Sequence, residues 1–534
     1  MLLPFLIFTS IAALIYYIYQ YGTKNENFFL EKGIKFQKPT FLFGNCFDMV
    51  RNKIGFFDYM RYIGEKFPNE KIIGHFDFRS PLFVILDPEI VKYLAVKEFD
   101  NFCDHRSVFD EKQDPLFGNS IFSLRGQKWR DMRATLSPAF TGSKMRQMCD
   151  LIVEICDQIV DFMKKEAEEK GPQTYEMKEF FSKFGNDIIG TCAFGVKVNS
   201  FTNKENDFYA CASRLFNFTS FKVQLKLILF RLCPKIMELF KIPLFEENDR
   251  NFLKNLVLDT MKVREEKKII RPDMIHLLME AQKGNLTHND NDMDTAGFAT
   301  VEESEIGLVK SKRKWSDDEL VAQCFLFFLA GFDTSSTVLS FLFYEIVANP
   351  DVQEKLYEEI SEVHANLEGK PLKYETLPKL KYLDMVISEA LRKWPVQAVD
   401  RVCIRDFTFK YDGDKEFTFH KGDAFWVPIL AYHYNPEYFP DPDKFDPERF
   451  NDENKEKINT STYLPFGVGP RNCIGSRLGL MNLKAIVFYI VLNFHLEATE
   501  KTQIPIQLAK NLLGLQPEKG IHILFRPRNQ KKLD

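Results

Sequence analysis

The chain opens with a run of twenty residues without a charge, Leu2 to Tyr21. About 20 apolar residues are what a helix needs to cross the hydrocarbon core of a bilayer. Tyrosines gather at the far end of this run, and lysines follow it while none precedes it, a pattern that places the rest of the chain in the cytosol. We therefore expect a transmembrane anchor over residues 1–21. A cleaved signal peptide is the alternative, although the run is longer than the usual apolar region of one.

The pattern of apolar positions then changes several times along the chain. Residues 22–50 contain Gly33, Pro39 and Gly44, which predicts a linker. Residues 71–87 predict two strands around the turn at Ser80-Pro81. From about residue 88 to 282 the apolar spacing is mostly helical, and residues 283–315 are polar and predict a long surface loop.

One helix is expected to be unusually long. Ser316 and Glu319 have the spacing of a capping box, and the apolar pattern continues to about Ala348 before Asn349-Pro350 ends it. A helix of this length must cross the core of the molecule.

Short strands are predicted again after the long helix. Phe407–Phe409 and Phe417–Phe419 flank Asp412-Gly413 as a hairpin, and Ala424–Val427 makes a further strand. We expect these strands to return to the small sheet that begins at residue 71. The predicted fold class is therefore mainly α with a small β-sheet region.

The composition narrows the possible functions. Hydrophobic residues make up 45% of the 534 residues and charged residues 27%, which excludes a wholly disordered chain and a polytopic membrane protein. The net charge of -4 is too balanced for a nucleic-acid partner. The 53 phenylalanines favour an apolar ligand, and the 10 cysteines show no disulfide or zinc spacing.

The segment that indicates chemistry surrounds Cys473, which lies just before a predicted helix. The positive end of the helix dipole and the neighbouring Arg471 would lower the pKa of its thiol and make a thiolate available as a nucleophile or metal ligand. Gly467 and two further glycines allow a tight loop against which a flat cofactor can lie, and Phe466 would exclude water. The alternative for any cysteine is a small buried hydrophobe, which we accept for the other nine.

These residues, from Phe466 to Gly475, match the pattern F-x-x-G-x-R-x-C-x-G at every fixed position and resemble the ligand loop of cytochrome P450, the haem-thiolate monooxygenases. The resemblance implies the P450 fold over residues 51–534, with the long helix crossing a bound haem b. It implies that Cys473 is the axial iron ligand and that its electron donation favours cleavage of the O–O bond. Phe466, Gly467 and Arg471 are then cofactor-binding, Arg471 through a haem propionate.

Glu389 and Arg392 lie at positions i and i+3 of a predicted helix. Alone, such a pair is typical of an exposed helix face. The family carries an E-x-x-R pair upstream of its ligand loop, with a second arginine from a segment similar to Pro447–Phe450. The resemblance therefore implies a buried structural triad of Glu389, Arg392 and Arg449.

Asp333 and Thr334 interrupt the apolar pattern of the long helix. One interpretation is that Thr334 donates to the carbonyl one turn earlier and bends the helix. The stretch from Ala330 to Ser335 also resembles the family's oxygen-activation motif. That resemblance implies catalytic roles, with Thr334 holding water or dioxygen and Asp333 relaying protons from solvent.

Three further residues are implied to bind the haem propionates. Trp129 and Arg133 match the family's W-x-x-x-R pair, although an exposed, solvated Arg133 is the alternative. Arg401 resembles a third propionate-binding arginine. By position in the family, the substrate-lining regions are Phe102–Phe122, Phe208–Phe221, Phe328, Phe332, Val396–Val399 and Leu512–Leu515.

The function implied by the resemblance is insertion of one oxygen atom from O2 into a lipophilic small molecule. Electrons would come from NADPH through a separate NADPH-cytochrome P450 reductase, with cytochrome b5 as a further candidate partner. Similarity to microsomal forms of the insect detoxification branch implies an endoplasmic reticulum membrane, a catalytic domain facing the cytosol, and xenobiotic substrates. The alternatives are a haem-thiolate isomerase or dehydratase, which needs no electrons, and a non-enzymatic haem or lipid sensor.

Overall fold

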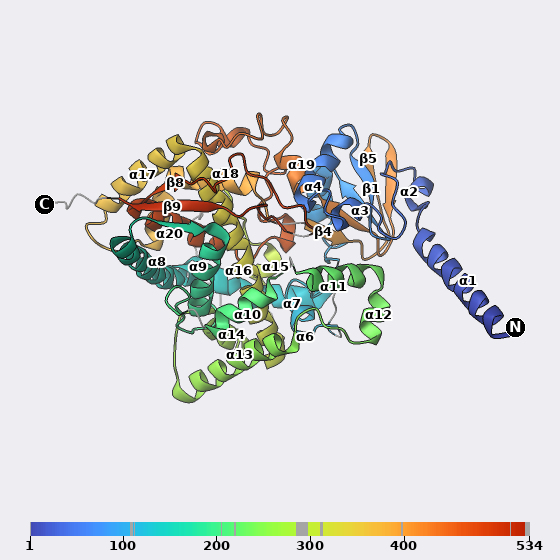
Figure 1. Cartoon of the computed structure of the whole chain (residues 1–534), viewed down its shortest axis with the longest axis horizontal. Helices are drawn as coiled ribbons and strands as arrows, with labels where there is room; N and C mark the ends of the chain where they lie inside the picture. Colours follow the sequence, from blue (N-terminus) through green and yellow to red (C-terminus); the bar gives the residue numbers. More distant parts are fainter. Residues whose placement is uncertain are drawn as a thin grey trace.

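Helices make up most of the chain, and strands gather at two places on the helical body (Figure 1). The computed structural model describes residues 2–106, 111, 113–203, 206–217, 220–284, 297–309, 313–396, 399–512 and 514–528. The helices are α1 (Leu2–Thr23), α2 (Phe28–Glu31), α3 (Phe47–Val50), α4 (Phe56–Lys66), α5 (Pro88–Lys92), α6 (Pro115–Gly118), α7 (Gly126–Leu136), α8 (Gly142–Lys170), α9 (Met177–Cys192), α10 (Asp207–Leu215), α11 (Phe221–Leu232), α12 (Pro234–Leu239), α13 (Glu247–Lys267), α14 (Met274–Gln282), α15 (Glu305–Leu308), α16 (Asp317–Ala348), α17 (Pro350–Ala365), α18 (Lys381–Lys393), α19 (Ile429–His433) and α20 (Ser476–Asn493).

The long helix α16 runs through the middle of the helical body, as its apolar pattern predicts (Figure 1). It has 32 residues, and at its start the capping box between Ser316 and Glu319 is present. Its apolar side chains are buried on most of its circumference, where it packs against α9, α13, α18 and α20. A helix that is apolar on all sides is stable only inside a large core. The predicted position across the core is confirmed.

Among the described residues the strands form three sheets, whereas the sequence pattern predicts one. The first has the order β1-β2-β7-β4, the second β3-β9-β8, and the third is the β5-β6 hairpin. The expectation that the hairpin joins the first sheet is wrong, because it contacts that sheet through side chains rather than backbone: the rings of Phe417 and Phe419 lie 5.1 and 5.2 Å from that of Phe83. The strands are β1 (Ile72–Asp77), β2 (Ser80–Ile85), β3 (Gln173–Glu176), β4 (Val399–Val402), β5 (Phe407–Asp412), β6 (Lys415–Phe419), β7 (Ala424–Val427), β8 (Phe494–Ala498) and β9 (His522–Pro527).

The N-terminal helix α1 projects away from the body and buries none of its side chains (Figure 1). Two described helices, Leu2–Glu31 and Asp317–Ala348, are long and apolar enough to cross a membrane, and the second is the core helix α16. Residues after α1 pack on the first sheet, where Phe29 is fully buried. A Cβ at Gly74 would lie 2.4 Å from the ring of Phe29, so the strand needs glycine at this contact.

Glu389 and Arg392 of α18 form a fully buried ion pair. The Arg392 guanidinium donates to both carboxylate oxygens of Glu389, at 2.7 and 2.8 Å, and Arg449 reaches the same carboxylate at 3.4 Å. Arg392 also donates to the carbonyls of His433 and Pro442. The three charged residues therefore fasten the irregular segment that follows α19 to α18.

Substitution of Glu389 tests this contact. Glu389→Gln leaves the fully buried guanidinium of Arg392 without its counter-charge, and we expect the free energy of unfolding to fall by about 3–5 kcal/mol. The matched control is Lys381→Ala on the same helix, whose ion pair with Asp452 is exposed and should contribute less than about 1 kcal/mol. Urea unfolding followed by far-ultraviolet circular dichroism measures both. Equal midpoint shifts for the two variants would contradict a structural role for Glu389.

Candidate active site

Cys473 and Thr334 line the same cavity, of about 210 Å³, between α16 and the start of α20. The sulfur comes from the loop before α20, and the hydroxyl comes from the middle of α16. Most of the remaining wall is apolar. Other described residues that line it include Phe140, Ala330, Gly331, Leu391, Val396, Phe466, Ile474, Leu478 and Gly479.

The cysteine loop is a tight turn that depends on its glycines. Gly467 and Gly469 have φ angles of 81° and 70°, in the left-handed region that favours glycine. A Cβ at Gly469 would lie 2.1 Å from the carbonyl oxygen of Ala95, so no other residue fits there. The loop closes when the amide of Cys473 donates to the carbonyl of Phe466 at 2.9 Å. This geometry holds the sulfur at the cavity wall.

The pKa of the Cys473 thiol differs from the prediction. Burial raises its pKa above the ordinary value, although the amide of Gly475 and the charge of Arg133 act in the opposite direction. The expected lowering by Arg471 is wrong, because its guanidinium is turned away and donates to the carbonyls of Cys103, Ile121 and Leu124. A coordinated metal ion would act in the opposite direction to burial and hold the sulfur deprotonated.

Two buried arginines lie against the cysteine loop. Arg401 of β4 donates to the carbonyl of Val468 at 2.7 Å, and the guanidinium of Arg471 lies 4.0 Å from the ring centre of Trp129. Burial lowers the pKa of Arg401 to about 10. Burial, with the nearby charge of Arg401, lowers that of Arg471 to about 9.

This charge is only partly neutralised. Arg471 has one carboxylate contact, Asp104 at 3.4 Å, and the buried Nε of Arg401 has no hydrogen-bond partner in the described part of the chain. A buried donor without a partner is costly, so it normally indicates a missing group. The carboxylates of a haem would satisfy it, and the apolar cavity beside Cys473 suits a flat porphyrin. The residues present therefore fit the cofactor.

Arg133 of α7 is buried and held by partners that the sequence does not reveal. Its guanidinium donates to the carboxylate of Glu303 at 2.8 to 3.2 Å and to Asn472, the neighbour of Cys473, at 2.8 Å. The alternative of an exposed Arg133 is therefore wrong. Glu303 belongs to the polar stretch expected to be a surface loop, but Ala299 within this stretch is 4% exposed. Within this stretch, α15 packs against α7.

Asp333 and Thr334 are adjacent in α16 but point to different surroundings. The hydroxyl of Thr334 donates to the carbonyl of Ala330 at 2.6 Å, which is the bond to the preceding turn that the first interpretation of this motif predicts. Thr334 lines the cavity of Cys473, whereas Asp333 does not. Its carboxylate lies 2.7 Å from the ammonium of Lys178 in α9, a partner that no sequence signal indicated.

A second cavity, of about 590 Å³, adjoins the first, because Leu326, Ala330 and Val396 line both. Four of the predicted substrate-lining regions reach it. Residues 107–110, 112, 218–219, 397–398 and 513 of those regions lie outside the described residues. Phe328 and Phe332 instead are buried in aromatic packing. Predicted residues on the wall are Phe117, Phe122, Phe216, Val396, Leu512 and Leu515.

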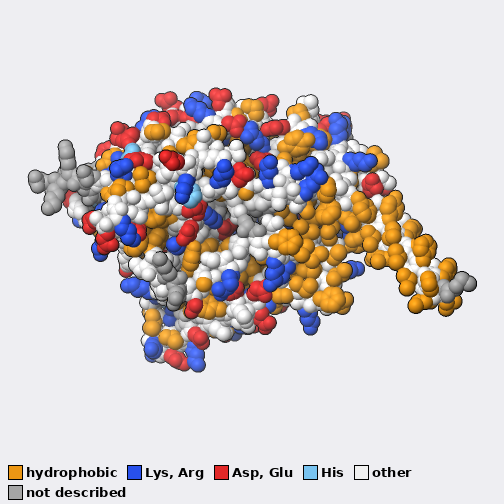
Figure 2. Space-filling view, viewed as in Figure 1, with side chains coloured by type: hydrophobic (Ala, Val, Ile, Leu, Met, Phe, Trp, Pro, Cys, Tyr) orange, Lys and Arg blue, Asp and Glu red, His pale blue; other side chains and the backbone are white. Residues whose placement is uncertain are grey.

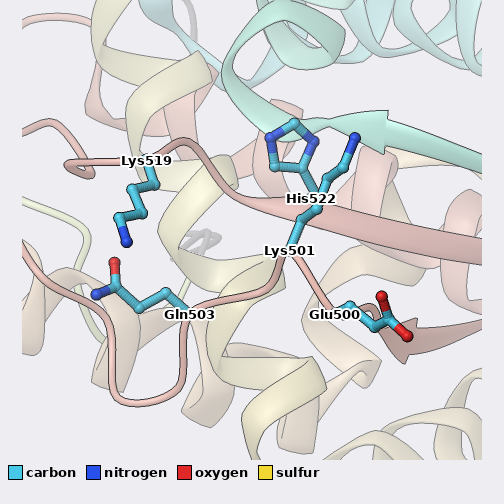
Figure 3. A pocket seen from close by; sticks show the side chains of 5 residues that line it. All are labelled: Glu500, Lys501, Gln503, Lys519 and His522. Atoms are coloured by element: carbon cyan, nitrogen blue, oxygen red, sulfur yellow. The ribbon is translucent and has the colours of Figure 1, made fainter.

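A polar hollow of about 350 Å³ near β9 is a poorer candidate (Figure 3). It is lined by Glu500, Lys501, Gln503, Lys519 and His522 and contains none of the predicted site residues. Figure 3 shows that these side chains point in different directions rather than toward one point.

Comparison with known proteins agrees with this geometry. The family model for cytochrome P450 matches residues 34–525. The probable cytochrome P450 9f2 of Drosophila melanogaster is 42% identical, over 99% of this chain and 100% of that protein. Cytochrome P450 9e2 of Blattella germanica is 38% identical, over 98% of each. The chain therefore belongs to the cytochrome P450 family, the haem-iron monooxygenases.

Proposed function

We propose that the protein is a membrane-anchored monooxygenase of lipophilic small molecules, including xenobiotics, in which Cys473 is the iron ligand and Thr334 the catalytic hydroxyl. The observation that carries the proposal is that one apolar cavity places these two groups on walls formed by different elements. When bound, haem b supplies reductive activation of O2, with one oxygen atom entering the substrate and the other leaving as water. The apolar walls keep bulk water from the reacting atoms.

Residues of the cysteine loop, of α7 and of β4 would hold the cofactor. Cys473 supplies the sulfur, Phe466 and Gly467 form the loop beside it, and Trp129, Arg133, Arg401 and Arg471 supply donors for the carboxylates. The unpaired Nε of Arg401 supports this assignment most directly. Arg133 would have to share its donors with Glu303.

Proton delivery is proposed to pass through α16. Thr334 lines the cavity, and its hydroxyl, which donates to the carbonyl of Ala330, can still accept a hydrogen bond. The Asp333 carboxylate is 40% exposed and paired with Lys178. We infer that Asp333 takes protons from solvent and passes them toward Thr334 when its side chain leaves Lys178.

The surface supports association with a membrane. Figure 2 shows hydrophobic side chains continuing from α1 onto α11 and α12. Phe221 of α11, Leu239 of α12 and Phe240, just after α12, are 79%, 76% and 69% exposed. Large contiguous apolar patches are rare on soluble proteins and mark interaction sites. We propose that α1 spans the endoplasmic reticulum membrane and that α11 and α12 touch its cytosolic face.

Electrons are proposed to arrive from NADPH-cytochrome P450 reductase or cytochrome b5 at the face that carries the cysteine loop. Lys128 and Arg130 belong to α7, the helix whose Arg133 donates to Asn472 beside Cys473. Both hold partners already, Glu319 at 2.9 Å and Asp100 at 2.6 Å, so their charge is partly compensated. Charged residues at the edge of a protein–protein interface affect the association rate with the partner more than the affinity for it.

Replacement of Cys473 tests the ligand. Cys473→Ser removes the sulfur, and we expect the ferrous carbonyl complex to lose the absorbance maximum typical of thiolate ligation. Cys403→Ser is the matched control, a buried thiol outside the cavity. A carbonyl spectrum in Cys473→Ser that equals that of the unchanged protein would contradict the assignment.

Replacement of Thr334 tests the proton path. Thr334→Ala removes the hydroxyl from the cavity while leaving Cys473 in place, so the thiolate spectrum should remain. We expect a lower yield of product per NADPH consumed and more hydrogen peroxide, with the ratio of peroxide to product rising about 100-fold or more if general acid catalysis is lost. Both products are measured in one reconstituted assay. An unchanged yield per NADPH would contradict the role of Thr334.

A further inference from the structure

Two arginines and one aspartate meet at the wall of the larger cavity. Asp77 ends β1, Arg106 lies in the segment that precedes α6, and Arg231 belongs to α11. The Nη1 atom of Arg231 donates to Oδ2 of Asp77 at 2.7 Å, and Nη1 of Arg106 lies 3.0 Å from the same oxygen. All three residues line the cavity. The cluster is the main charged feature of an otherwise apolar wall, as far as its described residues show.

The cluster carries an unbalanced positive charge. Burial alone would raise the pKa of Asp77, but Arg231 and Arg106 outweigh burial and hold it below the ordinary value, so Asp77 is ionised. One carboxylate then serves two guanidinium groups. The only other acid among the described lining residues, Asp400, accepts from the ring of His105 and the backbone amide of Arg106. Arg106 and Arg231 therefore retain donors and charge for an anion.

The cluster is held in position before any ligand arrives. The contacts of Asp400 fix the backbone at Arg106. Arg231 precedes Leu232, whose carbonyl accepts from the hydroxyl of Tyr21 at 2.6 Å, near the end of α1. The two arginines therefore line the part of the cavity that is near the contact between α1 and α11. Donors fixed in advance lose little entropy on binding.

An apolar path leads from the cluster toward the reacting groups. The cavity wall contains phenylalanine and leucine side chains, and Leu326, Ala330 and Val396 join it to the cavity of Cys473 and Thr334. One end of the path is cationic and the other is apolar. A molecule that matches both ends has an anionic head and a hydrocarbon tail.

We propose that this protein takes long-chain carboxylates as substrates. Arg106 and Arg231 bind the carboxylate, and the chain points toward Thr334, so that oxidation occurs at carbons remote from the carboxylate. The reaction is that of the proposed function, on which this inference rests. A C–H bond is broken and a C–O–H group is formed with one atom of O2, while the other atom leaves as water with two electrons from NADPH and two protons. Arginine forks suit carboxylates because two parallel hydrogen bonds can form.

Binding is tested with three ligands that share a twelve-carbon chain. Dodecanoate, its methyl ester and dodecyltrimethylammonium are titrated, below their micelle concentrations, into the haem-loaded full chain. The absorbance change of the haem and, independently, calorimetry report affinity. We expect dodecanoate to bind about tenfold or more tightly than the neutral ester, and the cation to bind weakest, because charged hydrogen bonds favour the anion.

Variants assign that preference to the cluster. Arg231→Gln should bring the affinities for acid and ester to within about threefold of each other. If Arg231→Gln does not take up haem, Arg106→Gln provides the same test. Lys222→Gln is the matched control, because it removes one positive charge from the same helix, where Lys222 pairs with exposed Glu246 outside the cavity. It should leave the preference intact. Equal binding of acid and ester by the unchanged protein, or a full preference retained in both arginine variants, would overturn the proposal.

Product analysis tests the orientation. Hydroxylation of dodecanoate should fall in the half of the chain far from the carboxylate, and Arg231→Gln should spread it along the chain. Oxidation next to the carboxylate would overturn the proposed orientation. Failure of the proposed function is distinguishable, because the reconstituted protein would then form no NADPH-dependent oxidation product from any lipophilic molecule, whereas failure of this inference leaves the oxidation of neutral lipophilic molecules unchanged.

Discussion

Hydrogen bonds from buried arginines to backbone carbonyls hold the irregular parts of this structure together. Arg471 donates to carbonyls of the segment between η1 (Tyr93–Lys97) and α7, and Arg401 donates to the cysteine loop. Arg392 does the same for the segment after α19. Chain without helix or strand partners must still satisfy its buried carbonyls. Arginine suits this task because one side chain offers five donors in a rigid fork.

The same arrangement concentrates positive charge around the cysteine loop. Arg401 and Arg471 are buried, both have lowered pKa values, and few acids lie beside them. The unpaired Nε of Arg401 fits the proposed role of these arginines as donors to the carboxylates of a haem. The neighbouring cavity is apolar, so the site combines a charged rim with a dry interior. Polarity then rises again at Arg106 and Arg231, at the far wall of the larger cavity.

Much of the site was predictable because its signals are local. The cysteine loop needs glycines at particular φ angles, and the capping box of α16 needs two residues three positions apart. The triad of Glu389, Arg392 and Arg449 also lies where the motif spacing indicated. The pKa of Cys473 was not predictable, since it depends on burial and on the direction in which Arg471 turns. The three separate sheets were missed because pairing between distant strands leaves no periodic pattern.

Sequence alone determined the cysteine loop, the long central helix, the apolar N-terminal run and the mainly α class, since each follows from neighbouring residues and their periodicity. Only the tertiary structure decided which charges meet. Glu303 reaches Arg133, Lys178 reaches Asp333, and Arg106 and Arg231 share Asp77. The members of each pair are separated by long stretches of chain, and exposed and buried charges look alike in a sequence. Packing of the helices and loops brings them together, because a buried charge is tolerated only beside its partner.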